Sequence, residues 1–183
     1  MTYKLKIAGL ERELPLCPIS ERLMIAGFVM LGDTELTEAC AAGLCRLLPE
    51  HDLLFTAETK GIPLICAMAR QLGEDRYIVA RKAPKLYMKD MIKCEVRSIT
   101  TEGSQCLYLD GADVELMRGK RIVIVDDVVS TGQSLHALEE LARMAGAQIV
   151  GKMAVLAEGN AIGRDDIRYL APLPLFDKEG KPV

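Results

Sequence analysis

Two adjacent carboxylates, Asp126 and Asp127, stand directly before a run of small residues, VVSTGQS, at positions 128–134. Neighbouring residues of a strand point to opposite sides, and carboxylates are costly to bury unless hydroxyls or cations engage them. The run offers O–H donors and opens a predicted helix whose free N–H groups attract an anion. The pattern predicts one phosphate at this helix N-terminus, with the carboxylates either accepting hydrogen bonds from sugar hydroxyls or meeting a hydrated Mg²⁺. Helix capping by Ser130 and Thr131 alone would explain the hydroxyls but not the acidic pair.

The segment before the acidic pair, RIVIV at residues 121–125, has four β-branched residues in a row and predicts a central strand buried on both faces. Similar apolar runs predict three further strands, at residues 52–57, 76–82 and 148–156. Helical spacing of apolar residues predicts three helices, at residues 34–48, 62–73 and 135–146. This alternation is typical of right-handed βαβ units. It predicts an α/β fold with a central, mostly parallel twisted sheet and helices on both faces.

The basic residues are concentrated in one part of the chain. A formal net charge of −3 would by itself favour a neutral ligand. Residues 81–97, however, carry six basic side chains against two acidic ones, a local charge of +4, so that the rest of the chain carries −7. Arg81 and Lys82 end a predicted strand, and ligands of parallel sheets bind at the carboxyl ends of strands. The start of this segment therefore predicts contact with a polyanion, whereas its later basic residues are expected to form a solvated charged face.

The composition is that of one globular domain, with 183 residues, of which 50% are hydrophobic and 27% charged. No segment approaches the 18 apolar residues of a membrane span, and the first residues form no signal-peptide core. A cytoplasmic protein without a membrane or nucleic-acid partner is therefore expected. The six cysteines include no C-x-x-C pair and are expected to be reduced, buried thiols. His51 and His136 lack metal-ligand spacing and are expected at the surface.

The run RIVIVDDVVSTGQS resembles the phosphoribosyl-pyrophosphate (PRPP) fingerprint of the type I phosphoribosyltransferases. The chain is also similar, in order and spacing over about residues 52–170, to the purine-specific adenine and xanthine enzymes of that family. The segments that carry this similarity are ETKGIPL, ARKAPKL, TTEGSQCLYLDGADVELMRGKRI and AEGNAIGRDDI. The resemblance implies a single domain, 1–183, in which about residues 1–32 and 165–183 form a small hood and about residues 83–105 form a flexible lid.

The resemblance also implies the roles of individual residues. The PRPP 5-phosphate would be bound by Val129, Ser130, Thr131, Gly132, Gln133 and Ser134. The pyrophosphate would be bound by Thr59, Lys60, Gly61, Arg81, Lys82 and Lys85, with a non-proline cis peptide in the loop that begins at Glu58. Asp126 and Asp127 would bind the ribose hydroxyls and contact Mg²⁺ through water, the ion being held mainly by the substrate. Glu102 would correspond to the lid glutamate of the adenine enzymes, although their L-E-Y-G stretch reads T-T-E-G-S-Q here.

The implied activity is transfer of the phosphoribosyl group of PRPP to a purine base, with Mg²⁺ as cofactor, adenine favoured over xanthine and other oxopurines, and a homodimer expected. Residues 16–31 and 169–176 would form the base pocket. The alternative is a non-catalytic regulatory protein of the same fold that binds PRPP or a nucleotide. Such regulators usually carry a DNA-binding domain, and residues 1–50 show no basic recognition helix. Neither G-x-x-x-x-G-K-[ST] nor G-x-G-x-x-G occurs, which excludes a P-loop or dinucleotide fold.

Overall fold

The computed structural model describes residues 1–96 and 105–183, and a five-stranded sheet lies at its centre. The strand order is β10-β9-β8-β4-β5, and every neighbouring pair is parallel. The strands are β4 (Leu53–Ala57), β5 (Ile78–Ala80), β8 (Arg121–Val129), β9 (Gln148–Glu158) and β10 (Arg168–Leu173). This arrangement confirms the predicted α/β class with a parallel central sheet.

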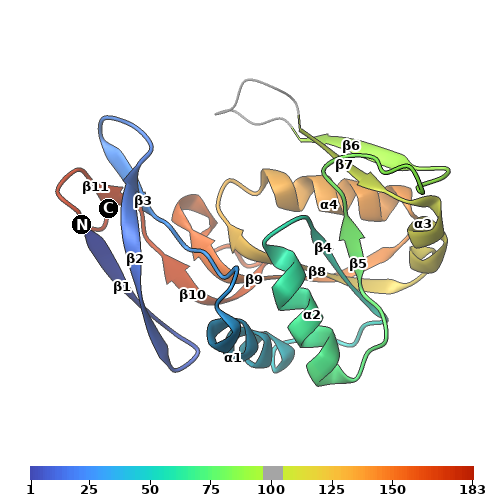
Figure 1. Cartoon of the computed structure of the whole chain (residues 1–183), viewed down its shortest axis with the longest axis horizontal. Helices are drawn as coiled ribbons and strands as arrows, with labels where there is room; N and C mark the ends of the chain where they lie inside the picture. Colours follow the sequence, from blue (N-terminus) through green and yellow to red (C-terminus); the bar gives the residue numbers. More distant parts are fainter. Residues whose placement is uncertain (97–104) are drawn as a thin grey trace.

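Helices cover both faces of this sheet (Figure 1). One face is covered by α1 (Thr34–Cys45) and α2 (Gly61–Leu72), which pack against each other, and the other by α4 (Gln133–Met144). A shorter helix, α3 (Gly111–Met117), leads into β8, and a 3₁₀ turn, η1 (Gly159–Ala161), follows β9. Asp33 caps α1 by accepting a hydrogen bond from the Leu36 N–H at 3.0 Å, and Gly73 ends α2 in the left-handed conformation with φ +72°.

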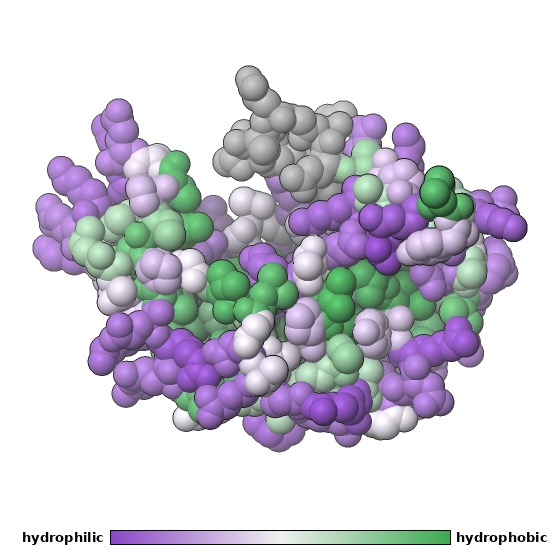
Figure 2. Space-filling view, in the orientation of Figure 1, coloured by the Kyte–Doolittle hydropathy of each residue, from purple (hydrophilic) through white to green (hydrophobic). Residues whose placement is uncertain are grey.

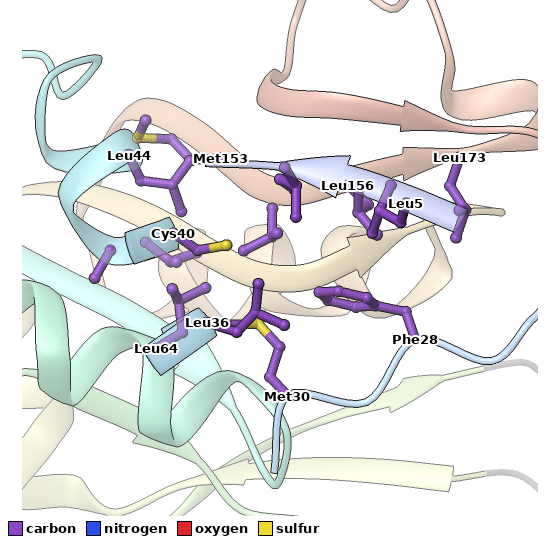
Figure 3. Packing of buried hydrophobic residues seen from close by; sticks show 14 of the residues in the cluster. Leu5, Phe28, Met30, Leu36, Cys40, Leu44, Leu64, Met153, Leu156 and Leu173 are labelled. Atoms are coloured by element: carbon purple, nitrogen blue, oxygen red, sulfur yellow. The ribbon is translucent and has the colours of Figure 1, made fainter. Parts of the chain in front are cut away.

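The core is divided by the sheet into two clusters. Along β8, Ile122 and Ile124 belong to the cluster under α4, whereas Val123 and Val125 belong to the cluster on the α1 and α2 side. All four are fully buried, which explains the continuous run of β-branched residues there. Figure 3 shows the second cluster, in which residues of α1 and α2 pack against β9 and against Phe28 and Leu5 from the N-terminal region.

A second sheet, the hood sheet, is antiparallel and has the order β1-β2-β3-β11. Its strands are β1 (Thr2–Ile7), β2 (Leu10–Pro18), β3 (Leu23–Ala26) and β11 (Phe176–Asp177). The chain ends meet here, with the rings of Tyr3 and Phe176 4.9 Å apart (Figure 1). Arg12 of β2 binds Asp33 at 2.7 Å and Glu35 at 2.7 Å, which ties the hood sheet to the start of α1.

Several element boundaries differ from the predicted ones. The central strand continues to Val129, because β9 pairs with it as far as Ala157, so the acidic pair lies inside a strand and not beyond its end. Residues 168–173, which the sequence places in the hood, form β10 at the edge of the central sheet. The predicted strand at 76–82 is shortened to β5, and the helix predicted to reach residue 48 ends at Cys45.

Two further strands, β6 (Ile92–Val96) and β7 (Gln105–Leu109), pair antiparallel, and β6 lies within residues 83–105, for which a lid is predicted. Arg97 and Glu102, singled out from the sequence, lie outside the described residues. Two further expectations are wrong. The His51 side chain is only 9% exposed, because it packs between Pro49 and Glu74. Of the cysteines, Cys40 alone is fully buried, although all six are free thiols. Over the described residues, no helix is long and apolar enough to cross a membrane.

Candidate functional site

The turn between β8 and α4 forms a small anion-sized pocket of about 40 Å³. It is lined by Asp126 and by residues 128–135, so the predicted loop residues Val129 to Ser134 are all brought together. Gly132 is the N-cap of α4 with φ +80°, and no side chain caps this helix end. The N–H groups of the first turn therefore remain free for a ligand, as expected of an anion site at a helix N-terminus.

Next to this pocket lies a larger cavity of about 210 Å³ that reaches the ends of β4 and β8. It is lined by Ala57, Glu58, Thr59, Lys60, Lys82, Leu107, Asp126, Asp127, Val128 and Ser134. Asp126 and Ser134 line both hollows, so the two are continuous. Both carboxylates thus face one cavity, although strict alternation along a strand would separate them. The Asp127 N–H donates to Asp126 Oδ1 at 2.9 Å, which holds the Asp126 carboxylate against the backbone of Asp127.

The loop between β4 and α2 forms the opposite wall. A cis peptide joins Glu58 to Thr59, as the resemblance implies. Lys60 precedes α2, and its Nζ lies 3.0 Å from Asp127 Oδ2. Gly61 follows and is buried against the Thr56 hydroxyl, since a Cβ at this position would stand 2.1 Å from Thr56 Oγ1. Only glycine lets the loop turn into α2 at this distance from the sheet.

The carboxylates of Asp126 and Asp127 lie in different electrostatic surroundings. Burial, together with the charge and the side-chain hydrogen bond of Asp127, raises the pKa of the Asp126 carboxyl, whereas the hydrogen bond from the Asp127 N–H and the charge of Lys60 oppose this shift. Asp127 is 4% exposed and lies against the Lys60 ammonium. At the same sheet edge, burial raises the pKa of Glu158, the last residue of β9, and Lys60 again opposes the shift. Lys60 therefore contacts Asp127 directly, and its charge opposes the pKa shifts of both Asp126 and Glu158.

The basic residues after β5 are placed differently from one another. Lys82 lines the larger cavity, whereas Arg81 and Lys85 do not. Arg81 Nε lies 2.6 Å from Glu58 Oε1, and the Lys82 N–H donates to Glu58 Oε2 at 2.8 Å. Of the residues predicted to contact pyrophosphate, Thr59, Lys60 and Lys82 are thus brought together around the cavity. Gly61 supports the loop from below.

Five residues that line the two hollows were not predicted as site residues from the sequence: Ala57, Glu58, Leu107, Val128 and Leu135. Glu58 begins the predicted pyrophosphate loop, but a carboxylate beside an expected pyrophosphate site gave no reason to assign it a binding role. Val128 sits inside the fingerprint, and its apolar side chain carries no chemical signal. Leu107 comes from β7, which folds back over the sheet edge, and nothing in the local sequence indicates that approach.

Known proteins are similar to this chain in sequence and in fold. Residues 42–171 match the model of the family described as "Phosphoribosyl transferase domain". The chain is 31% identical, over 160 residues, to a hypoxanthine/guanine phosphoribosyltransferase of Methanococcus maripaludis, and the match covers 82% of each chain. A second relative of the same description, from Methanospirillum hungatei, is 29% identical over 148 residues and covers 80% of this chain and 77% of its own.

Among solved structures, adenine phosphoribosyltransferase from Thermoanaerobacter pseudethanolicus has a TM-score of 0.70 at 21% identity. That match covers 87% of this chain and 95% of the other. The Saccharomyces cerevisiae adenine enzyme, solved with adenine and an imino-altritol bisphosphate, has a TM-score of 0.67 at 22% identity, with 86% and 92% covered. At these identities the likeness shows the common fold.

Proposed function

Because this chain belongs to the phosphoribosyltransferase family, as its match over residues 42–171 and its 31% identity to a relative show, we propose that it transfers the phosphoribosyl group of PRPP to a purine base and releases pyrophosphate. The observation that carries the proposal is the continuity of the two hollows. An anion pocket at the N-terminus of α4 opens through Asp126 into a cavity with a carboxylate pair on one wall and Lys60 and Lys82 on the other.

The proposed placement of PRPP follows from this continuity. The 5-phosphate occupies the pocket of residues 129–134, where N–H groups and hydroxyls donate to it. The ribose lies over Asp126 and Asp127, whose carboxylates accept hydrogen bonds from its 2- and 3-hydroxyls. The pyrophosphate meets Lys60, Lys82 and the backbone at Thr59. Arg81 and Lys85, which lie outside the cavity lining, add positive charge from nearby.

Displacement of pyrophosphate from the ribose C1 places positive charge on the sugar and negative charge on the leaving group. The carboxylate pair stabilises the first, and the lysines stabilise the second. No nucleophilic side chain is needed, because the base itself attacks C1 once it is aligned. This division of charge explains why acidic and basic residues face each other across a single cavity.

The donor set also fits Mg²⁺. Two neighbouring carboxylates, Asp126 and Asp127, face the cavity, and carboxylate oxygens that act through water are typical magnesium partners. The described residues contain no group of three or more His, Cys, Asp or Glu that could hold a metal, so most ligands of such an ion would come from PRPP and water. When bound, Mg²⁺ neutralises charge on the departing pyrophosphate.

The sequence and the comparisons favour different purine bases. The sequence favours adenine, and the named structural neighbours are adenine enzymes, whereas the curated relatives are named as hypoxanthine/guanine enzymes. The proposal is therefore a purine base, with 6-amino and 6-oxo purines as its two subclasses. The hood sheet with residues 16–31 and the neighbouring end of β10 are proposed to hold it.

We also propose a homodimer that works in the cytoplasm. Large apolar side chains are exposed on the connection between β3 and α1, where Val29 is 58% and Leu31 45% exposed. Figure 2 shows apolar surface where this connection crosses in front of the molecule, between the hood sheet and α2. Light scattering at micromolar concentration tests the assembly, and a monomer would exclude it.

The activity is tested by a turnover screen. Purified protein, Mg²⁺ and PRPP are combined in turn with adenine, hypoxanthine, guanine, xanthine and a pyrimidine, while pyrophosphate release is measured. Release with at least one purine and none with the pyrimidine supports the proposal. If PRPP binds but no base is converted, the regulatory alternative is favoured instead.

A further inference from the structure

The carboxylate of Glu58 lies in the wall of the cavity that the proposed function assigns to pyrophosphate. A negative charge there repels a polyanion, so its presence needs a compensating role. Glu58 is well enclosed, with its side chain 19% exposed, and it sits at the junction of β4 and the loop that carries Lys60. Its contacts indicate what that role is.

Glu58 contacts the last residue of β5 and the two residues that follow it. Its N–H donates to the Ala80 carbonyl at 2.9 Å, its Oε2 accepts the Lys82 N–H at 2.8 Å, and its Oε1 lies 2.6 Å from Arg81 Nε. Because β5 has only three residues and is the edge strand of the sheet, few ladder hydrogen bonds hold this segment. The Glu58 carboxylate thus adds two contacts, to Arg81 and to the Lys82 N–H, between the two halves of the pyrophosphate site.

Arg81 is itself held on several sides. Its backbone N–H and carbonyl exchange hydrogen bonds with Tyr108 of β7, each at 2.8 Å, and its Nη1 donates to the Tyr87 hydroxyl at 3.1 Å. With Glu58 at its Nε, the guanidinium is directed into this cluster and away from the cavity lining. Arg81 therefore neutralises Glu58, and Glu58 in turn fixes the backbone from which Lys82 enters the cavity.

We propose that Glu58 is a positioning residue, which joins the loop of Lys60 to the segment of Lys82 through its paired contact with Arg81. This inference rests on the proposed function and refines it, because it makes Arg81 a partner of Glu58 and not a direct pyrophosphate ligand. Replacing Glu58 by a neutral residue should then weaken pyrophosphate binding. Simple electrostatics would predict the reverse, because the replacement removes a negative charge from the site.

The test measures KM for PRPP, kcat and the binding of magnesium pyrophosphate by calorimetry in the intact chain. Glu58→Ala should raise KM for PRPP about 10-fold or more, with kcat within about 3-fold of wild type. Glu58→Gln keeps an acceptor for the Lys82 N–H but loses the charge, and should show an intermediate rise. Glu115→Gln is the matched control, since its exposed pair with Arg118 lies on α3, and KM should not change.

A double-mutant cycle separates pairing from direct contact. If Glu58 and Arg81 act as a unit, the double variant Glu58→Ala/Arg81→Met should bind magnesium pyrophosphate no more weakly than either single variant. Multiplying losses would mean that Arg81 binds pyrophosphate itself and would overturn the proposal, as would a KM for Glu58→Ala at or below that of wild type. Failure of the wild-type chain to bind magnesium pyrophosphate or PRPP would instead contradict the proposed function.

Discussion

Lys60 Nζ lies 3.0 Å from Asp127 Oδ2 and joins the loop before α2 to the acidic pair of β8. The lysine side chain is half exposed, whereas the carboxylate is almost fully buried. A PRPP molecule in the cavity would compete with Asp127 for this ammonium. The same lysine therefore stabilises the free protein and, on the proposed function, binds the pyrophosphate.

Lys60→Met should reduce both stability and PRPP affinity. The buried Asp127 carboxylate loses its cation, which should cost about 1 kcal/mol of unfolding free energy, because the half-exposed lysine is partly screened by water. Adding Asp127→Asn removes the stranded charge, so the double variant should regain stability but not affinity. Urea unfolding and calorimetry with PRPP measure the two effects.

The matched control for this pair is Lys4→Met, because the Lys4 ion pair with Glu11 is exposed on the hood sheet. Lys4→Met should change neither the free energy of unfolding nor the affinity for PRPP. A Lys60→Met protein that binds PRPP as tightly as wild type would show that Lys60 has only the structural role.

Asp126→Asn should change the dependence of stability on pH. Burial, with the neighbouring charge of Asp127, raises the pKa of Asp126, so the folded protein keeps a proton that the unfolded chain releases above about pH 4. Stability is therefore lost as pH rises from that value to the raised pKa. Asp126→Asn lacks this loss of stability. Above neutral pH, its free energy of unfolding, measured with urea, should therefore exceed that of wild type by an amount of the order of 1 kcal/mol.

The contribution of Asp166 to stability should depend on pH in the opposite direction. Hydrogen bonds from Arg164 and Lys152 lower its pKa, so its contribution is present at neutral pH and is lost as the solution is acidified. Asp166→Asn should thus be less stable than wild type at pH 7 and approach it at low pH. If both variants shifted stability in the same direction at pH 7, the assignment of the Asp126 environment would be wrong.

Gly132→Ala should disrupt the anion pocket. Gly132 has φ +80°, and a Cβ on it would lie 2.8 Å from Arg164 Nη1, whose guanidinium is held in place because it donates two hydrogen bonds to Asp166. We expect the loop to shift and PRPP affinity to fall by about 10-fold or more, measured by calorimetry.

The control is Gly73→Ala at the end of α2, with φ +72° and open space around it. It carries the same backbone cost, about 1 kcal/mol, without a collision and away from the cavity. Its stability should fall while PRPP binding stays unchanged. Equal affinities for the two variants would show that the Arg164 contact is unimportant for the pocket.

Much of the site was predictable because its elements are local. The strand of residues 121–125, the acidic pair and the loop to Ser134 are contiguous, and their pattern predicts a phosphate pocket at a helix start. Lys60 and Lys82 follow predicted parallel strands, so their meeting at one sheet edge is also predictable. The approach of Leu107 depends on a hairpin folding back over the sheet, and the role of Glu58 depends on a contact with Arg81 across 23 residues. The hydrophobic periodicity of the sequence predicts neither the approach of Leu107 nor the contact between Glu58 and Arg81.

The residues that belong to the hood sheet could not be predicted from the sequence either. The resemblance implies a small hood built from both ends of the chain, but strand pairing decides which residues belong to it. Residues 168–173 join β9 in parallel, and only Phe176 and Asp177 pair with β3. A register set by distant backbone groups cannot be read from the composition of either segment.

The most direct test of the central claim, that the carboxylate pair of β8 and the loop after it form a PRPP site, is the initial rate of pyrophosphate release with the best purine. Wild-type protein is compared with Asp126→Asn/Asp127→Asn, with folding checked by circular dichroism. We predict measurable release by wild type and a loss of more than about 100-fold in the folded double variant. A double variant that keeps a near wild-type rate would contradict the account.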